Sequence, residues 1–180
     1  ETTDFLADKS PDKRGKLIDE LLDSDSYQQS FFNFWADVLR LKSTTVGGGN
    51  SAAAGYAYIH WLKDILAKNT PYDEMVRQLI TADGKTYENG AVGFYIRDYN
   101  MPLDNMAVTT QIFLGTSMVC AQCHNHPFDK WTQMDYYQMA AFFTQMKRKG
   151  QGISAPISGE PEQWWFAPGT ASIEHPVTKV

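Results

Sequence analysis

One short motif constrains this chain more than any other feature: two cysteines separated by two residues and followed at once by a histidine, Cys120-Ala121-Gln122-Cys123-His124. These are the only two cysteines among the 180 residues. Such side chains at this spacing suit three kinds of chemistry: covalent attachment of haem, a redox-active disulfide, or part of a zinc site. Whichever applies, we expect the chemistry of the chain at this motif.

Haem attachment agrees with both the spacing and the residue types. Two thiols held two residues apart can add to the two vinyl groups of one haem, and the next residue then lies under the iron. The motif thus predicts one covalent haem c attached through Cys120 and Cys123, with His124 as the proximal iron ligand. Such iron exchanges single electrons, so we expect an electron-transfer domain rather than a catalyst.

Two other uses of the motif stay open as alternatives. A redox disulfide of the thioredoxin type normally opens a helix in a βαβ unit, whereas the region around this motif is predicted to be helix, loop, helix. A structural zinc site could use Cys120, Cys123, His124 and His126, but four ligands within seven residues make a cramped shell. Either would make the chain a non-haem module of a larger envelope protein.

The ligand on the opposite face of the iron is predicted from the loop around Met101. Pro102 disfavours a helix at the residue before it, so the Met101 thioether is expected on an exposed loop, where a soft sulfur ligand can reach a haem. Met106 is the next candidate, and His60, His175 or a vacant position are further alternatives.

Several polar side chains are candidates for contacts with the haem edge. His126 follows His124 by two residues and cannot readily reach the opposite face of the same haem, so we expect it to bind a propionate or to hold the loop. Arg97, Lys130 and Trp131 could donate to the propionates, because carboxylates favour charge-assisted partners.

The hydrophobic spacing predicts a mainly α fold: one domain of about five to six helices around the haem, with an irregular C-terminal tail. Residues 1–150 are expected to form the haem-binding domain, and the Gly-, Pro- and Ser-rich segment 151–180 to pack on it or to link it to a further domain. The pattern places a loop at 46–55 and a short strand or extended segment at 91–96. Helices are predicted to start at Ser10 and over 24–39, 56–68, 70–84, 104–118 and 132–143, with caps at Ser24 and at Asp104 or Asn105 and a capping-box-like pair at Thr132 and Asp135.

Charge and hydropathy exclude two classes of partner. Lys and Arg number 16 against 21 Asp and Glu, a net charge of −5 without an extended basic cluster, which argues against nucleic acid. The apolar runs are far shorter than the roughly 20 residues of a membrane span. Residues 1–10 are polar, so an export signal is expected to have been cleaved or to lie outside this sequence.

Beyond the motif itself, several segments resemble the planctomycete-type cytochrome c domains. The resemblance covers roughly residues 5–146 and is carried by Phe34-Trp-Ala-Asp-Val-Leu-Arg, Trp61 with Asn69-Thr-Pro-Tyr-Asp, Val92-Gly-Phe-Tyr-Ile-Arg-Asp, Met101-Pro-Leu-Asp-Asn-Met, Phe113-Leu-Gly-Thr, and Cys-Ala-Gln-Cys-His-Asn-His-Pro-Phe-Asp-Lys-Trp-Thr-Gln-Met-Asp-Tyr-Tyr from Cys120 to Tyr137. Those domains are largely of unknown function.

The resemblance implies a setting as well as a cofactor. Such domains usually lie in large exported proteins, so it implies a periplasmic or cell-envelope location beside other domains of the same protein. It also implies a redox protein or a dehydrogenase as the electron partner.

Overall fold

The computed structural model describes residues 2–41, 51–150 and 159–179, without the side chains of 51–54. Within these ranges the chain is mainly helical and forms one small domain with a three-stranded sheet, which confirms the mainly α prediction, although the described residues form eight α-helices rather than the predicted five to six. Its α-helices are α1 (Thr2–Ala7), α2 (Lys13–Leu22), α3 (Asp25–Val38), α4 (Ser51–Ala67), α5 (Tyr72–Ile80), α6 (Gly93–Ile96), α7 (Pro102–Leu114) and α8 (Gln133–Thr144). The 3-10 turns are η1 (Gly90–Val92) and η2 (Val119–Gln122), and the strands are β1 (Gly84–Lys85), β2 (Met146–Lys149) and β3 (Gln163–Phe166).

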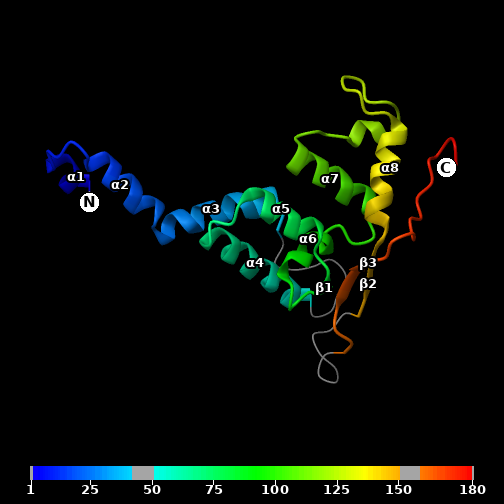
Figure 1. Ribbon diagram of the computed structural model, residues 1–180, viewed down its shortest axis with the longest axis horizontal. Coiled ribbons are helices and arrows are strands. Elements are labelled where there is room, and N and C mark those ends of the chain that lie inside the picture. The colour runs from blue at the N-terminus through cyan, green and yellow to red at the C-terminus, as the bar shows by residue number, and fades with distance from the viewer. Residues whose placement is uncertain (1, 42–50, 151–158, 180) are drawn as a thin grey trace.

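The helices divide into an extended arm and a packed body (Figure 1). α1, α2 and α3 follow one another along the long axis, and none of them contains a fully buried residue. α3 joins the body through Phe32 and Trp35, which pack against the core beneath α4. Among the described residues, no helix combines the length and apolar character that crossing a membrane requires.

Two clusters of buried side chains form the core of the body. The larger lies among α4, α5, η1 and α6 and centres on Leu62, Leu79 and Val92, whose side chains are fully buried. The smaller joins α7, η2 and α8 through Met106, Ala121 and other buried residues, namely Met118, Tyr136 and Ala140. Because Ala121 belongs to the cysteine motif, the second cluster is what fixes the motif to the helices.

Segment 91–96 is helical, so the predicted short strand or extended segment was wrong. The Asn89 side chain accepts a hydrogen bond from the Ala91 amide (3.2 Å) and starts η1, which continues into α6. Residues 91–96 are all buried. A short run that is apolar on every side has the same pattern in a buried strand and a buried helical segment, so periodicity could not distinguish them.

Helix boundaries differ from the predicted ones at two further places. α4 already begins at Ser51, so the predicted loop was wrong for 51–55, while 46–50 lie outside the described residues. α7 begins at Pro102 rather than after a cap at Asp104 or Asn105, because proline at the first helical position loses no intrahelical hydrogen bond. It ends at Leu114, before Gly115 with its left-handed φ of 63°, instead of reaching Met118.

The tail beyond Gly150 contributes a strand to the sheet, which the sequence did not predict. β3 lies between β1 and β2 and pairs antiparallel with both, with Trp164 opposite Gly84 and Arg148. Trp164 is only 4% exposed, so this residue of the tail is buried against the body. Strands of two to four residues carry too little pattern to be recognised without their partners.

Two buried tyrosines predict how the stability of the fold responds to alkaline pH. Burial raises the pKa of Tyr58 and Tyr95 above the usual value of about 10. Above about pH 10 the unfolded chain releases these two protons while the folded protein still keeps them. The free energy of unfolding is therefore undiminished below about pH 10 and falls as the pH rises further. Urea unfolding at neutral pH and at about pH 11 measures the loss.

The two hydroxyls differ in their partners, which supplies a control. Tyr95 donates to the Ile80 carbonyl (2.5 Å), whereas the buried Tyr58 hydroxyl has no hydrogen-bond partner within residues 2–41, 51–150 and 159–179. We expect Tyr95→Phe to cost about 1 kcal/mol at neutral pH, and Tyr58→Phe to be neutral or stabilising. A Tyr58→Phe protein that is less stable than Tyr95→Phe would contradict this assignment.

Candidate functional site

The cysteine motif lies between α7 and α8, in η2 and the loop that rises above α8 in Figure 1. The sequence predicted this position between two helices. η2 is held by the Ala121 amide, which donates to the Met118 carbonyl (2.9 Å). The amides of Cys123 and His124 both turn back to the Cys120 carbonyl, at 3.4 and 3.5 Å. This tight turn gathers the three residues at one end of the body.

Both thiols and the imidazole of the motif are accessible. Cys120 and Cys123 are free cysteines and are exposed, as is His124. Nδ1 of His124 lies 2.6 Å from the Asn125 carbonyl oxygen. Because a carbonyl oxygen can only accept, Nδ1 carries the proton and Nε2 keeps its lone pair. A histidine that binds a metal normally donates its other N–H in this way, so His124 is prepared for ligation through Nε2.

A set of hydrogen bonds ties the motif to the start of α8. The Gln122 carbonyl accepts from Gln133 Nε2 (2.9 Å) and from the Tyr137 hydroxyl (3.4 Å). Oδ1 of Asn125 accepts from the Gln133 amide (3.0 Å). α8 itself starts with the predicted capping box of Thr132 and Asp135, whose pKa is lowered by hydrogen bonds from the Thr132 amide and hydroxyl. The motif is therefore held by the first turn of a well-capped helix.

Asn125, Gln133 and Tyr137 were assigned no role from the sequence. For Asn125 and Gln133 the sequence does contain a signal. The predicted cap at Thr132 leaves the amide of the next residue, Gln133, without an intrahelical partner. Asn125 is the acceptor that supplies one. The contact of Tyr137 depends on where η2 lies, which no local pattern shows.

His126 closes the loop that follows the motif. Its amide donates to the Trp131 carbonyl (2.8 Å), and its Nδ1 accepts from the Phe128 amide (3.3 Å). Among the two roles considered for His126, these contacts are those of a residue that holds the loop. A contact with a propionate stays a prediction.

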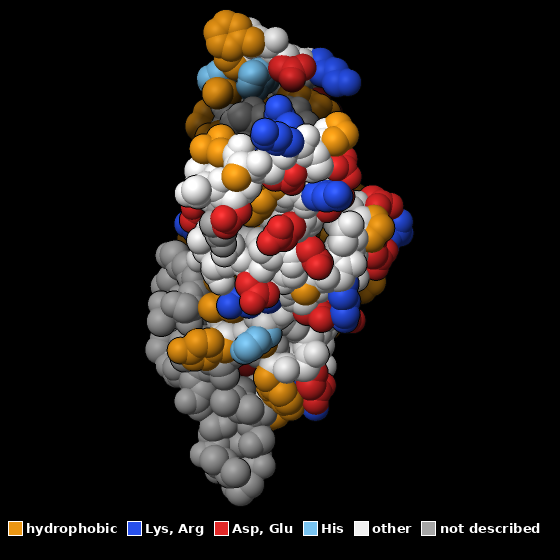
Figure 2. Space-filling view, turned by 90° about the vertical axis from the view of Figure 1, so that its left-hand side faces the viewer, with side chains coloured by type: hydrophobic (Ala, Val, Ile, Leu, Met, Phe, Trp, Pro, Cys, Tyr) orange, Lys and Arg blue, Asp and Glu red, His pale blue; other side chains and the backbone are white. Residues whose placement is uncertain are grey.

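The loop carries features that fit a flat apolar group with acidic substituents. Phe128 is 95% exposed and Val119 is 52% exposed, so apolar surface beside the thiols faces outward. Figure 2 shows hydrophobic and histidine side chains together at the upper tip, where Figure 1 places this loop. Nε1 of Trp131 is buried without a hydrogen-bond partner in the described part of the chain, and Nζ of Lys130 lies 5.2 Å from the centre of the Trp131 ring. An N–H donor and a cation are thus available for a carboxylate.

The two methionine candidates lie on either side of the turn that starts α7. Met101 precedes this helix and is 48% exposed, as its position before Pro102 predicted. Met106 is fully buried in the same cluster as Ala121 of the motif. Tyr136 connects the start of α7 to the motif: its hydroxyl donates to the Leu103 carbonyl (3.5 Å). Burial, followed by the charges of Asp104, Tyr137 and Cys123, raises the pKa of Tyr136 to about 12.

The two histidine candidates for the second iron ligand lie in different places. His60 is exposed on α4, which packs mainly against η1, α3 and α6. His175 is buried and its ring centre lies 5.5 Å from that of Tyr137, close to the motif. Its Nδ1 accepts from the amides of Val177 (3.3 Å) and Thr178 (3.0 Å), so the proton of the neutral ring is on Nε2. In this arrangement neither nitrogen of His175 is free to ligate.

Arg97 lies at the end of α6, next to α3. Its Nη1 donates to the Arg40 carbonyl (3.2 Å) and its Nε is 3.9 Å from Asp98 Oδ1. Burial, followed by repulsion from Arg40, lowers the pKa of its guanidinium. These contacts are with α3 and α6 rather than with the motif, and a role at a propionate stays a prediction.

The two alternative uses of the cysteines can be compared with the geometry. The described residues contain no group of three or more His, Cys, Asp or Glu side chains placed to hold a metal ion. The thiols of Cys120 and Cys123 are not joined in a disulfide.

Comparison with known proteins identifies one relationship. A family model with the description "PSCyt2: Protein of unknown function (DUF1549)", a planctomycete cytochrome domain family, matches residues 1–148. No curated protein and no solved structure matches the chain. The match includes the cysteine motif and every described helix, and it ends within β2.

Proposed function

The chain belongs to the PSCyt2 family, and we propose that it is a mono-haem c-type cytochrome domain that transfers single electrons in the periplasm or cell envelope. The observation that carries this proposal is the state of the motif. Two free, exposed thiols stand two residues apart, and the adjacent His124 donates through Nδ1 and keeps Nε2 for a metal. A disulfide would leave the His124 imidazole without a role, and among the described residues no group of three or more His, Cys, Asp or Glu side chains is placed to hold a zinc ion.

Each residue has a defined part in this proposal. Cys120 and Cys123 would form the thioether bonds, and His124 would bind the iron. Trp131 Nε1, the buried donor without a partner, would bind a propionate. Met101, exposed before α7, is the proposed second iron ligand, with the buried Met106 as the alternative. A bound haem would supply the one-electron exchange between Fe(II) and Fe(III).

The surroundings of the motif support exchange with a partner protein. The loop projects from the body, and Phe128 offers apolar surface beside the thiols. Weak redox complexes bury little surface, so contact with a partner protein through this projecting loop needs no deep cleft. We propose a redox protein or a dehydrogenase as the partner, and other domains of the same exported protein as neighbours.

The test is the absorption spectrum of the chain produced in a periplasm with the cytochrome c maturation machinery, followed by mass analysis under denaturing conditions. We expect a Soret band that shifts on reduction and a mass increased by one haem, because thioether bonds survive denaturation. The same chain produced without that machinery is the control and should carry no covalent haem. Matured protein with neither band nor added mass would overturn the proposal, and zinc analysis and thiol titration would then decide between the alternatives.

A further inference from the structure

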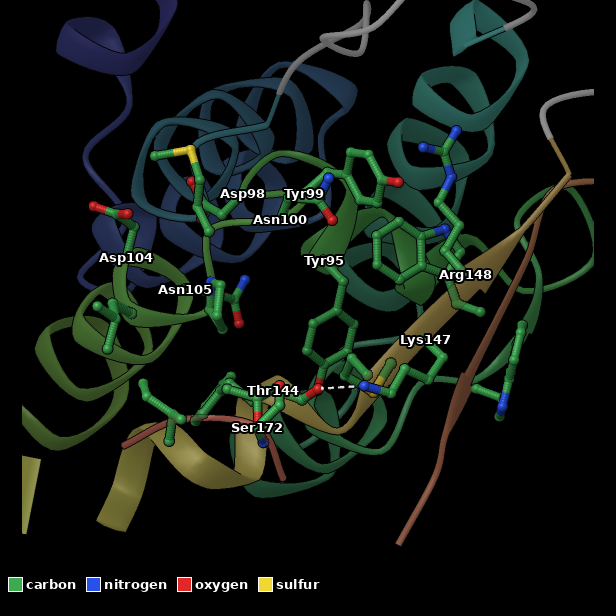
Figure 3. Close-up of a pocket in the computed structure, with 18 residues that line it drawn as sticks. Tyr95, Asp98, Tyr99, Asn100, Asp104, Asn105, Thr144, Lys147, Arg148 and Ser172 are labelled. Carbon is green, nitrogen blue, oxygen red and sulfur yellow. Dashed lines mark hydrogen bonds between the residues drawn. The ribbon is translucent and has the colours of Figure 1, made fainter. Parts of the chain in front are cut away.

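A second site of interest is an open cavity of about 930 Å³ between the start of α7, the end of α8 and the sheet. Figure 3 shows that its walls come from segments far apart in the sequence: 95–105, 143–148, 164–165 and 172–173. Its volume lies in the range of small-molecule sites, roughly 300–1,000 Å³. None of the cysteines or histidines of the motif lines it.

One wall is a rigid stack of aromatic and charged side chains. The Arg148 guanidinium lies 4.4 Å from the ring centre of Tyr99 and 5.8 Å from that of Trp164. Nε of Arg148 is 2.8 Å from Oε1 of Glu162, which also accepts from Trp164 Nε1 (3.1 Å). Because these contacts occur within the protein itself, the aromatic wall is formed before any ligand binds, which lowers the entropy cost of binding.

The opposite wall contains a polar group that lacks a partner. Asn105 is only 4% exposed, and its buried Oδ1 accepts no hydrogen bond from any of the described residues. In Figure 3 its amide points into the open space between α7 and Tyr95. A buried acceptor left without a donor costs roughly 1–3 kcal/mol, so a ligand that donates a hydrogen bond here would recover that cost.

The charges around the cavity balance. Asp98 and Asp104 face Lys147 and Arg148, so the lining has no net formal charge. Asp98 is already paired with Arg40 (3.7 Å), and Nζ of Lys147 donates to the Thr144 carbonyl (3.0 Å). Since Arg148 is also paired with Glu162 (2.8 Å), Asp104 and Lys147 remain, one charge of each sign, and the lining favours neither an anion nor a cation.

The remaining lining combines hydrogen-bonding side chains with flat apolar ones. Two amides and two hydroxyls face the cavity together with aromatic rings, namely Asn100, Asn105, Thr144 and Ser172 with Tyr95, Tyr99, Trp164 and Trp165. A purely apolar ligand would leave the amides unsatisfied. A molecule with hydroxyl groups around its rim and C–H groups on its faces satisfies both. We propose that this cavity binds a neutral mono- or disaccharide, with Asn105 accepting a hydrogen bond from one of its hydroxyls.

Saccharide binding requires no haem, although Met101, the proposed second iron ligand, also lines the cavity, and the test measures binding alone. Cellobiose and maltose are titrated into the full chain, followed by tryptophan fluorescence and by saturation-transfer NMR, with glucuronate and glucosamine as charged comparisons. We expect saturable binding of at least one neutral disaccharide, and weaker binding of both charged sugars. Binding of neither disaccharide, or binding of charged sugars alone, would overturn the proposal.

Asn105→Leu separates a binding role from a structural one. Removing an unpaired buried acceptor should leave the thermal stability unchanged or raise it, whereas the saccharide affinity should fall by about tenfold with the lost hydrogen bond. Asn33→Leu is the matched control, because Asn33 is exposed on α3 and bonds only to Gln29 there. Unchanged affinity in a folded Asn105→Leu protein would contradict the assignment of Asn105, and equal loss in Asn33→Leu would show that the effect is not specific to the cavity.

Discussion

The double variant Cys120→Ala, Cys123→Ala is expected to fold normally and to retain no haem after denaturation. No other cysteine exists in the chain to replace the thiols. Both side chains are exposed and lie outside the two core clusters, so their loss should change the free energy of unfolding by only about 0.5 kcal/mol. Mass analysis of denatured protein measures attached haem, and circular dichroism with thermal unfolding measures the fold.

Four further variants bracket this result. Each single cysteine variant should keep one thioether bond and part of the covalent haem. Val119→Ala, in the same 3-10 turn and 52% exposed, should keep all of it. His124→Ala should keep the thioether bonds but change the spectrum, because it removes only the proposed iron ligand. Covalent haem in the folded double variant would show that the attachment is not through these thiols.

Gly93→Ala is expected to cause a large loss of stability through a single added methyl group. A Cβ at Gly93 would overlap Cβ and Cγ of Tyr58 and would lie 2.7 Å from its Cδ1. Tyr58 is 3% exposed, so it has no space to move away. The φ of Gly93, −53°, is open to any residue, so the cost comes from overpacking rather than backbone strain. We expect roughly 3 kcal/mol, which for a chain of this size lowers Tm by roughly 6–12 °C.

Gly15→Ala is the matched control for this prediction. Gly15 lies inside α2, and nothing is within 4 Å of the position that its Cβ would take. Alanine is a better helix former than glycine. This variant should therefore raise the free energy of unfolding by up to about 1 kcal/mol and should not lower it. Thermal unfolding by circular dichroism compares the two proteins. A Gly93→Ala protein as stable as Gly15→Ala would show that α4 and α6 can separate without cost.

Local chemistry accounts for most of what the sequence predicted correctly. The capping box at Thr132 and Asp135, the cap at Ser24 and the exposure of Met101 before Pro102 all depend on residues within four positions of one another. The mainly helical fold class follows from the same short-range spacing. Where the predictions failed, at 91–96 and 51–55, the local pattern was compatible with more than one backbone conformation.

In the candidate site, too, the residues set by local spacing were predicted from the sequence, and those set by distant contacts were not. Cys120, Cys123 and His124 are recognised from five consecutive letters, because their chemistry depends on spacing along the chain. The side chains that hold them could be only partly recognised. Tyr137 reaches the Gln122 carbonyl, and Tyr136 reaches Leu103, across distances of 15 and 33 residues in the sequence.

By itself, then, the sequence predicted most of the helices, the caps at Ser24 and Thr132, and the cluster of thiols and imidazole, since each depends on neighbours in the chain. Only the tertiary structure decided that a strand from the tail completes the sheet, that Gly93 meets Tyr58, and that Asn105 faces a cavity without a partner. The physical reason is that strand pairing, close packing and hydrogen-bond satisfaction between distant segments depend on where the other segments lie. That arrangement is a property of the whole fold, and no short stretch of residues encodes it.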